Sequence, residues 1–501
     1  DYPLDPDVLK LLLRPREATV EEPLSDHELV CEALALTRPE IPRARLTYLG
    51  KLPQALRGAG FCLTVTARDG ELVDAEPGDT TQHVYGVAID VGTTTIAASL
   101  HHLRTGEQLA LTARVNPQVE WGEDVITRLN ATFKKPDVVK DLQRAVVRAI
   151  TEMVRRMCAA AEVELERVYE FVLAGNAAMN HLLLGVPPEN IGLAPYTPVF
   201  RDPETLDARE IGLRGNEAAG AYILPNMGGF VGGDTSAGML VSALGSTKET
   251  ELLIDIGTNC EVVLAHGGRL YAASAPAGPS LEGACIECGM RAEAGAIDDV
   301  TIADGEVRVS VIPGEEARGL CGSGLVHAVD ALRAAGVVQG NGRFVEPETI
   351  NPLRRRFDSD GNGQVRFLIR AQAEGAARDV WLTQKDVREF QLARAAITSA
   401  WKTLCDEAGC EPEDIRRVYV AGAFGNYIRP EVARSLGFTP GTETVEVVSA
   451  GNASLDGARK VLLNRGARAQ ARELPNRVAF VELAGREDFD ELFAMELLLG
   501  H

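Results

Sequence analysis

Two short stretches of this sequence place a carboxylate, a glycine and polar side chains in the same order. Asp90 and Gly92 lead the first stretch, and Asp255 and Gly257 lead the second, 165 residues later. Glycine lets the backbone approach an anion closely, and a carboxylate can hold a hydrated divalent cation. The polar donors that complete the two turns are Thr93, Thr94, Thr95, Thr258 and Asn259. The two turns together predict a site for a polyphosphate and Mg²⁺, with Asp90 and Asp255 as the metal ligands.

Each of these turns lies between two apolar runs, which is the pattern of a β-hairpin. The first run covers residues 84–91, and the second hairpin is expected over residues 251–264. A single Asp-x-Gly-Thr turn is also typical of an ordinary tight hairpin. Two copies, each inside a long β-type run, favour a phosphate site.

Three other stretches bring glycine and polar residues to the start of a helix. Asn176 follows a strand expected at 170–174, and Asp234 ends a glycine-rich turn that begins near residue 223. Helix entries of this kind suit an anion, and we include Asp234 among the catalytic candidates. Simple N-capping by Asn176 or Asp234 remains an equal alternative. The third entry, before an apolar helix, consists of Gly322, Ser323 and Gly324.

A buried-type strand near the end of the chain, residues 417–421, runs into a glycine pair. Flat backbone at this place could lie against a purine and a ribose. The last helix of the core begins after a similar glycine. The residues assigned to the adenosine side are Gly422, Ala423, Phe424, Gly425, Gly451 and Asn452.

Residues 274–297 form a stretch too rich in glycine, proline and alanine for a regular element, and too apolar for a solvated linker. We expect a loop that is ordered against a ligand or partner, with permanent packing between lobes as the alternative. The pair Cys285 and Cys288 lacks a second cysteine pair, so a metal site would need ligands from another subunit. A calcium loop at 358–369 is not expected either, because its twelfth position is Ile369.

The amino-acid composition limits the classes of partner that this protein can have. The 51 basic and 72 acidic residues give a formal charge of −21, which argues against nucleic acid or an anionic membrane surface. No window approaches the length and hydropathy of a membrane span. Nine scattered cysteines without a secretory leader indicate reduced thiols and a cytoplasmic protein.

Residues 1–82 are expected to form a small α+β unit that serves as a spacer or dimerisation domain. A helix is expected from near Val8, and Ser25 to Glu28 read as a capping box for a second helix that ends near Leu36. A hairpin over residues 61–75 completes the unit. The rest, 83–501, is expected to be one domain of two lobes, at about 83–240 and 241–501.

These stretches jointly resemble the nucleotide site of the superfamily of acetate kinases, sugar kinases, heat-shock ATPases and actin. Within it, the sequence is similar to the reductive activators of corrinoid proteins, notably those that serve the corrinoid/iron-sulfur protein of the acetyl-CoA pathway. The stretches that carry the similarity are 90–95, 228–234, 278–297, 384–389 and 421–426. The resemblance implies an α/β fold of two duplicated actin-like (ribonuclease H-like) lobes with ATP between them.

The resemblance further implies an ATPase that returns cobalt(II) corrinoid to cobalt(I), with ATP or ADP, Mg²⁺, a corrinoid protein, an electron-donor protein and a homodimer. We expect the 274–297 loop to dock on the corrin, with Ser280, or less favoured Ser274, supplying an oxygen near cobalt. Glu282 and Arg291 are assigned to the same partner surface. Family members carry an iron-sulfur cluster, and this sequence, which starts at Asp1, has no four-cysteine run, so we expect that domain to be missing here.

Three alternatives stay open. A small-molecule kinase of the same superfamily would need a polar pocket, which the apolar 274–297 stretch disfavours. An activator of acyl-CoA dehydratases would bridge two subunits by a cluster on Cys285 and Cys288. A non-catalytic actin-like assembly module would form filaments without turnover.

Overall fold

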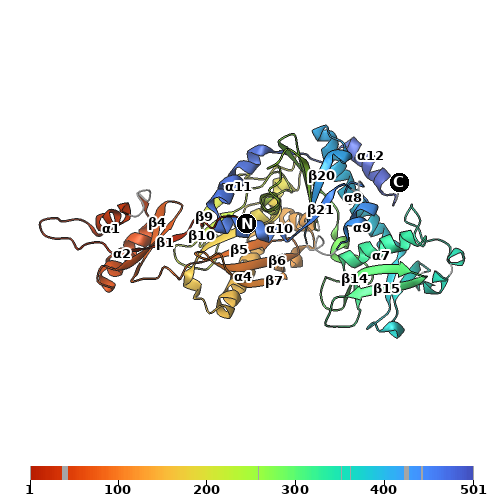
Figure 1. Ribbon diagram of the computed structural model, residues 1–501, viewed down its shortest axis with the longest axis horizontal. Coiled ribbons are helices and arrows are strands. Elements are labelled where there is room, and N and C mark those ends of the chain that lie inside the picture. The colour runs from red at the N-terminus through yellow and green to blue at the C-terminus, as the bar shows by residue number, and fades with distance from the viewer. Residues whose placement is uncertain are drawn as a thin grey trace. The chain divides into compact units, whose positions relative to one another are not determined.

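The computed structural model describes residues 2–36, 43–257, 259–350, 352–361, 363–422, 428–441 and 444–499. The chain divides into two compact units. The first comprises Asp1–Leu240 with Ser454–Pro475, and the second Val241–Ala453 with Asn476–His501. Each unit contains a six-stranded sheet with helices packed against it (Figure 1).

The sheet of the first unit has the order β7-β6-β5-β8-β10-β9. Its strands are β5 (Tyr85–Val91), β6 (Thr95–His102), β7 (Gln108–Val115), β8 (Val168–Ala174), β9 (Glu204–Asp207) and β10 (Gly220–Ile223). Strands β5, β6 and β7 form an antiparallel meander, and β8 and β10 continue in parallel from β5. All seven residues of β8 are buried, as expected of a central parallel strand.

The helices of this unit follow the polar and apolar periodicity of the sequence. They are α3 (Val125–Lys134), α4 (Val138–Ala160), α5 (Ala177–Leu184), α6 (Gly233–Ser242), α10 (Ala453–Leu463) and α11 (Arg465–Arg477). Helix α4 packs its apolar face on β6 and β7.

The second unit repeats the arrangement with the sheet β21-β20-β11-β12-β13-β22. Its strands are β11 (Thr250–Ile256), β12 (Cys260–His266), β13 (Arg269–Ala275), β20 (Ile415–Ala421), β21 (Glu446–Gly451) and β22 (Val478–Phe480). Again three strands form an antiparallel meander, and two more run parallel to the first of them. The expected duplication of α/β lobes is confirmed by this shared topology.

Two three-stranded sheets extend the second unit. One consists of β14 (Ala296–Ala303), β15 (Glu306–Val311) and β16 (Gly319–Leu320), and the other of β17 (Phe357–Ser359), β18 (Val365–Arg370) and β19 (Val380–Thr383). The helices are α7 (Gly322–Ala334), α8 (Gln384–Ala408), α9 (Pro430–Ser435) and α12 (Glu487–Glu496). Helix α8 packs on β12 and β13 and forms the centre of the core, since most of its apolar residues are buried.

Residues 1–82 lie in the first unit as a small α+β region with its own four-stranded sheet, β1-β3-β4-β2. Its elements are β1 (Leu9–Leu13), α1 (Asp26–Ala35), β2 (Arg43–Ala44), α2 (Leu46–Gly58), β3 (Leu63–Arg68) and β4 (Glu71–Pro77). The helix expected near Val8 is wrong, because β1 pairs there with β3. The capping box of Ser25 and Glu28 and the hairpin of β3 and β4 are confirmed.

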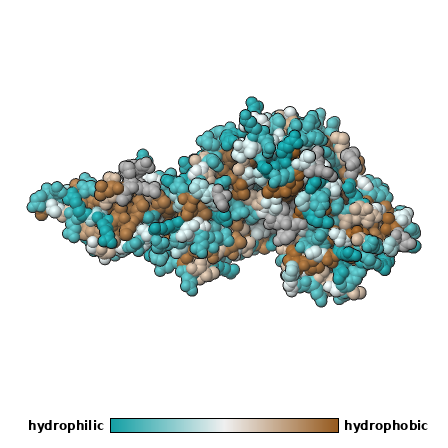
Figure 2. Space-filling model, viewed as in Figure 1, coloured by the Kyte–Doolittle hydropathy of each residue, from teal (hydrophilic) through white to brown (hydrophobic). Residues whose placement is uncertain are grey.

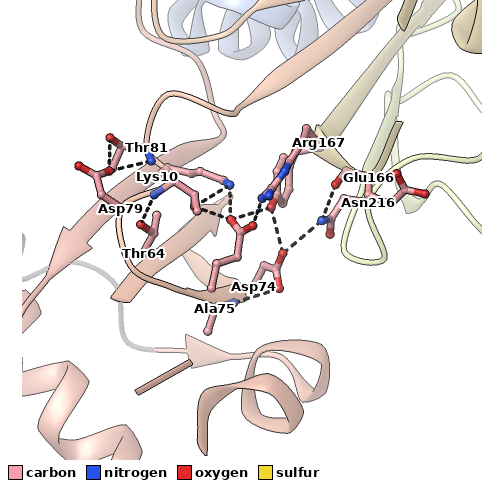
Figure 3. Close-up of polar contacts among 12 residues, drawn as sticks. Lys10, Thr64, Asp74, Ala75, Asp79, Thr81, Glu166, Arg167 and Asn216 are labelled. Atoms are coloured by element: carbon pink, nitrogen blue, oxygen red, sulfur yellow. Dashed lines mark hydrogen bonds and ion pairs between the residues drawn. The ribbon is translucent and has the colours of Figure 1, made fainter. Parts of the chain in front are cut away.

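A buried polar network joins this small region to the large sheet of the first unit (Figure 3). Glu76 forms ion pairs with Lys10 and Arg167, and Tyr169 donates a 3.0 Å hydrogen bond to Asp74. Burial lowers the pKa of Lys10 to about 7. Asn216 donates to the same carboxylate of Asp74 at 3.2 Å. Because β8 contributes Tyr169, the contact fixes the small region to a central strand.

The surface is largely hydrophilic in the view of Figure 2, with separate hydrophobic patches. Several of the exposed hydrophobic side chains belong to the small N-terminal region, among them Val20, Leu36 and Leu46 at 94%, 89% and 83% exposure. No helix within the described part of the chain combines the length and the hydropathy needed to cross a membrane.

Candidate nucleotide site

The turn between β5 and β6 has no room for a side chain at its glycine. A Cβ on Gly92 would lie 2.5 Å from the carbonyl oxygen of Thr95, so only glycine fits. The side-chain amide of Asn116 donates a 2.9 Å hydrogen bond to the carbonyl of Gly92. The expected hairpin is confirmed, and the need for glycine at position 92 comes from the tightness of the turn.

Thr93 in this turn is held from two sides. Asn176 donates from its side-chain amide to the Thr93 hydroxyl at 3.0 Å, and Arg128 donates to the Thr93 carbonyl. Arg128 is fully buried, and burial lowers its pKa to about 10. Arg128 was not recognisable as a site residue from the sequence, because an arginine on an amphipathic helix is usually exposed.

Asn176 also caps α5, because its side-chain oxygen accepts a 2.9 Å hydrogen bond from the backbone of Met179. The capping alternative is therefore confirmed, and the same side chain reaches the turn at Thr93. The helix entry and the hairpin turn are thus parts of one structure. The backbone of Gly175 accepts hydrogen bonds from Gly233 and Asp234, which adds the start of α6 to it.

Two carboxylates belong to this part of the first unit. Ser454, near the start of α10, donates a 2.8 Å hydrogen bond to Asp90. Burial raises the pKa of Asp234 to about 7, and the negative charge of Asp90 adds to the effect. The side chain of Asp234 accepts a 2.7 Å hydrogen bond from the backbone of Thr235. A carboxyl group that titrates near neutral pH can accept or donate a proton under physiological conditions.

Close backbone contacts fix this arrangement. A Cβ on Gly232 would lie 2.4 Å from the backbone of Asn176, and one on Gly457 would lie 2.4 Å from the backbone of Ala237. The glycine-rich turn before α6 and the glycine in α10 therefore serve close packing. Ser454 was not identified as a site residue from the sequence, since a serine near a helix start is usually a cap.

The second hairpin pairs β11 with β12. A Cβ on Gly257 would lie 3.3 Å from the carbonyl of Asn259 and 3.6 Å from a carboxylate oxygen of Glu282. The side-chain nitrogen of Asn259 is buried and has no hydrogen-bond partner within the described part of the chain. A buried donor without a partner is rare in native structures, and an anionic ligand at the turn would satisfy it.

Gly422 lies against this hairpin. Its φ is +90°, and a Cβ would be 2.4 Å from the carbonyl oxygen of Ile256 and 3.1 Å from a carboxylate oxygen of Asp255. Its backbone N–H donates a 2.9 Å hydrogen bond to the carbonyl of Gly451, and Gly451 also has a positive φ, of +58°. Gly422 and Gly451 thus bring the ends of β20 and β21 close to the end of β11, which carries Asp255. Asn452 follows Gly451 directly, before α10 begins.

Some expected positions cannot be compared with the structure. Thr258, Ala423, Phe424 and Gly425 lie outside the described residues. Their proposed contacts with phosphate and adenosine stay predictions.

The third helix entry is packed into the core. Gly322, Ser323 and Gly324 are buried at the start of α7, and a Cβ on Gly324 would lie 2.0 Å from the carbonyl of Ile297. The Ser323 hydroxyl lies 3.3 Å from the Cys321 sulfur. Packing against β14 accounts for Gly324, and a nucleotide contact at this entry stays a prediction.

The 274–297 stretch is ordered against its own unit. Ser274 lies in β13 and donates to Glu261 at 3.2 Å, and Ser280 is only 2% exposed with its hydroxyl 3.4 Å from the carbonyl of Glu389. Cys285 and Arg291 are exposed. The buried apolar side chains of the stretch include Leu281, Ile286 and Cys288. Ser280 could therefore reach a partner only after this segment opens.

The cysteines form neither disulfides nor a metal site within the described residues. All nine cysteines are free, and Cys288 accepts a 3.4 Å hydrogen bond from the backbone of Trp381. Among the described residues, no three His, Cys, Asp or Glu side chains are grouped so as to hold a metal ion. These residues therefore do not fit an iron-sulfur cluster.

The two duplicated sheets with their paired Asp-x-Gly turns define an actin-like ATPase. Residues 249–501 match the C-terminal domain of RACo, which is an ASKHA domain, the class of acetate and sugar kinases, heat-shock ATPases and actin. Residues 85–247 match the RACo middle region, and residues 1–82 match the RACo linker region. The chain belongs to the RACo family, the reductive activators of corrinoid proteins.

Individual relatives agree with this assignment. The corrinoid activation enzyme RamQ of Eubacterium limosum is 33% identical over 442 residues, which cover 87% of this chain and 74% of RamQ. The [Co(II) methylated amine-specific corrinoid protein] reductase of Methanosarcina barkeri is 28% identical over 448 residues, 83% of this chain and 77% of the reductase. The solved structure of a reductive activator for corrinoid, iron-sulfur protein is 32% identical, with a TM-score of 0.92 over 100% of this chain and 80% of that one.

Proposed function

We propose that this chain uses the binding and hydrolysis of ATP to drive the one-electron reduction of a corrinoid protein from cobalt(II) to cobalt(I). The observation that carries the proposal is the pair of matched hairpin turns, one in each unit, in a chain of the RACo family. The family match favours this activity over a small-molecule kinase or an acyl-CoA dehydratase activator.

Asp90 and Asp255 are proposed to hold the hydrated Mg²⁺ of the nucleotide. Mg²⁺ usually keeps several waters and takes only one or two carboxylates when it is bound together with phosphates. Two single carboxylates in matched turns suit this mode better than a cage of protein ligands. Asn259 supports the proposal because its buried amide donor has no hydrogen-bond partner among the residues that the structure describes. When bound, the ion would neutralise charge on the phosphates.

Asp234 is proposed as the base that takes a proton from the attacking water. A base is most effective when its pKa lies near the working pH. Burial and the charge of Asp90 bring the pKa of Asp234 to about 7, which meets this condition. Ser454 would keep the Asp90 carboxylate turned toward the ligand by its 2.8 Å hydrogen bond.

ATP is needed because the reduction is uphill. A change of environment that favours one oxidation state tenfold shifts a one-electron couple by about 59 mV, or about 1.4 kcal/mol. An activator that bound the cobalt(II) partner more tightly would oppose reduction unless another process supplied free energy. Closure and reopening of the two units with the nucleotide state would supply it and release the product.

The electron requires a separate donor. Cobalt(II) gains one electron to become cobalt(I), and the described residues offer no cluster that could deliver it. We propose that an iron-sulfur group outside the described residues, or another electron-transfer protein, delivers the electron. The chain itself would then supply docking and nucleotide-driven movement.

The partner is proposed to dock on the segment that follows β13. Names of relatives point to two candidate partners, a corrinoid/iron-sulfur protein and a methylamine-type corrinoid protein. Ser280 would supply an axial oxygen to cobalt(II) once the segment opens, with Glu282 and Arg291 at the partner surface. Cobalt(I) does not accept such a ligand, so docking would sense the oxidation state.

The test is ATP hydrolysis without and with each candidate corrinoid protein in the cobalt(II) state, under anaerobic conditions. We expect slow basal turnover and at least about a fivefold stimulation by the correct partner, which is about 1 kcal/mol of coupling. Stimulation by a small acid or sugar, and by neither corrinoid protein, would contradict the proposal and favour a kinase.

A further inference from the structure

The segment 279–291 is held in place by a carboxylate far away in the sequence. Asp386, in the first turn of α8, is 1% exposed. One of its oxygens accepts a 2.8 Å hydrogen bond from the backbone of Thr383, and the other accepts a 3.0 Å hydrogen bond from the backbone of Glu287. The bond from Thr383 is part of the capping box of α8, and the bond from Glu287 joins the start of α8 to the segment.

This carboxylate has no basic partner among the residues that the structure describes. A buried charge is costly unless it is paired or fully hydrogen-bonded. Its two oxygens are satisfied by backbone N–H groups, from Thr383 and from Glu287. An aspartate offers an acceptor on each side, whereas asparagine offers only one. The capping box alone would use one oxygen, so the contact with Glu287 is what the second oxygen adds.

Two other contacts attach the segment to the same junction of β19 and α8. The hydroxyl of Ser280 lies 3.4 Å from the carbonyl of Glu389, and the sulfur of Cys288 accepts from the backbone of Trp381 at 3.4 Å. Both are longer and weaker than the bond to Asp386. Cys285, two residues before Glu287, has φ +63° although it carries a side chain. A strained conformation of this kind persists only where the surroundings hold it.

The segment also contacts β16 and the second hairpin, between β11 and β12. Met290 donates to the carbonyl of Leu320 at 2.9 Å, and Leu320 donates to the carbonyl of Cys288 at 2.8 Å. Leu320 ends β16, directly before the entry to α7. Glu282 lies beside Gly257 of the second hairpin. The segment therefore spans the hairpin, the α7 entry and the start of α8 within one unit.

We propose that Asp386 is a positioning residue, which holds segment 279–291 closed in the free chain, so that the corrinoid partner must open the segment in order to dock. The inference rests on the proposed function, because it takes the segment as the docking surface. A partner that binds only the open segment has an apparent affinity lowered by the fraction of chains in which the segment is open. Asp386 touches neither nucleotide nor partner and acts only through Glu287.

The test compares Asp386→Asn with Thr383→Ala. Asparagine has only one side-chain oxygen, so in Asp386→Asn one of the two backbone N–H groups, of Thr383 or of Glu287, must face an amide N–H₂ group. We expect the bond to Glu287 to be lost, because a loop is displaced more easily than the first turn of a helix. Thr383→Ala removes the hydroxyl that accepts from Asp386 at 3.1 Å but leaves the carboxylate free to bind Glu287. Both variants weaken the N-terminal cap of α8, and only Asp386→Asn also weakens the contact with Glu287.

Hydrogen exchange of the free chain is the first measurement. We expect amides 283–291 to exchange at least tenfold faster in Asp386→Asn, and within about twofold of wild type in Thr383→Ala. Equal exchange of this segment in all three proteins would overturn the proposal. This result does not depend on the partner, so it stands apart from a failure of the proposed function.

Partner-stimulated ATP hydrolysis is the second measurement. The KM for the corrinoid protein should fall at least fivefold in Asp386→Asn, because the segment is open in more chains, while the KM for ATP stays within twofold and Thr383→Ala resembles wild type. An unchanged or higher KM for the partner in Asp386→Asn would contradict the role. If wild type shows no stimulation by either corrinoid protein, the proposed function fails, and the exchange data still decide whether Asp386 holds the segment.

Discussion

Ser454 donates a 2.8 Å hydrogen bond to Asp90, across 364 positions of sequence. The bond is possible because residues 454–475 belong to the first unit, although residues 241–453 of the second unit precede them in the sequence. Lys460 adds a 2.6 Å hydrogen bond from α10 to the carbonyl of Leu240 at the end of α6. Helix α10 thus completes the environment of the Asp90 carboxylate on β5.

Ser454→Ala should weaken binding of Mg-ATP about three- to tenfold. Loss of a hydrogen bond to a charged group costs about 1.5–3 kcal/mol when the group stays buried, and less where water replaces it. Titration calorimetry with Mg-ADP measures the change. Ser435→Ala is a matched control, since Ser435 bonds Asp330 at the surface of the other unit. Equal affinities in both variants would contradict a role for Ser454 at the nucleotide.

Asp90→Asn and Asp255→Asn should each lower the affinity for Mg-ADP at least tenfold, about 1.4 kcal/mol, because each removes a charge that orients the hydrated metal. ATP hydrolysis should fall at least a hundredfold. Asp304→Asn, in an exposed turn, serves as the control. Unchanged affinity and unchanged turnover in both variants would mean that the carboxylates do not hold the metal.

ATP hydrolysis should increase with pH through about pH 7, where Asp234 loses its proton and becomes a base. Asp234→Asn should lose this dependence together with most of the activity. The raised pKa also means that the folded state keeps a proton between about pH 4 and 7 that the unfolded state has lost, so stability falls as pH rises in that window. Asp234→Asn should therefore raise Tm at pH 8. A wild-type pH profile in Asp234→Asn would exclude Asp234 as the base.

Gly422→Ala should destabilise the second unit by about 1–3 kcal/mol, because its φ of +90° disfavours a side chain and the new Cβ would meet the carbonyl of Ile256. The displacement should reach Asp255 and weaken ADP binding in the folded fraction. Gly441→Ala is the control, since nothing lies within 4 Å of its Cβ. Full-strength ADP binding by folded Gly422→Ala would show that this glycine serves folding alone.

Ser280→Ala should change the stability of the free chain by less than about 1 kcal/mol, since its 3.4 Å hydrogen bond is weak. Affinity for a cobalt(II) partner should fall about tenfold, while affinity for the cobalt(I) form should not change. Ser274→Ala is the control on β13. If Ser280→Ala binds both oxidation states like wild type, and a deletion within 278–290 also binds, the segment is not the docking surface.

The hairpins were predictable because their information is local. Asp90 and Asp255 each lie near the end of an apolar run, just before a glycine, and these runs place both turns without knowledge of the fold. The capping box at Ser25 was local in the same way. The strand at Leu9 was missed because an apolar run of five residues fits a helix start equally well, and only its pairing with β3 decides.

The remaining contacts could not be read from the sequence because they join distant positions. Nothing near Arg128 indicates that it is buried beneath Thr93. The pairing of Asp386 with Glu287 joins residues 99 positions apart. The burial of Ser280 was also hidden, because a glycine- and proline-rich stretch reads as a loop whether it faces solvent or packs on a helix.

The central claim is that ATP hydrolysis drives the formation of cobalt(I). The direct measurement is the absorbance change of a cobalt(II) corrinoid partner, mixed anaerobically with this chain and a titanium(III) reductant, with ATP, with a non-hydrolysable ATP analogue or without nucleotide. The account predicts rapid accumulation of cobalt(I) with ATP and wild-type protein only, and no acceleration with Asp90→Asn. Cobalt(I) formation at the same rate without nucleotide would contradict it.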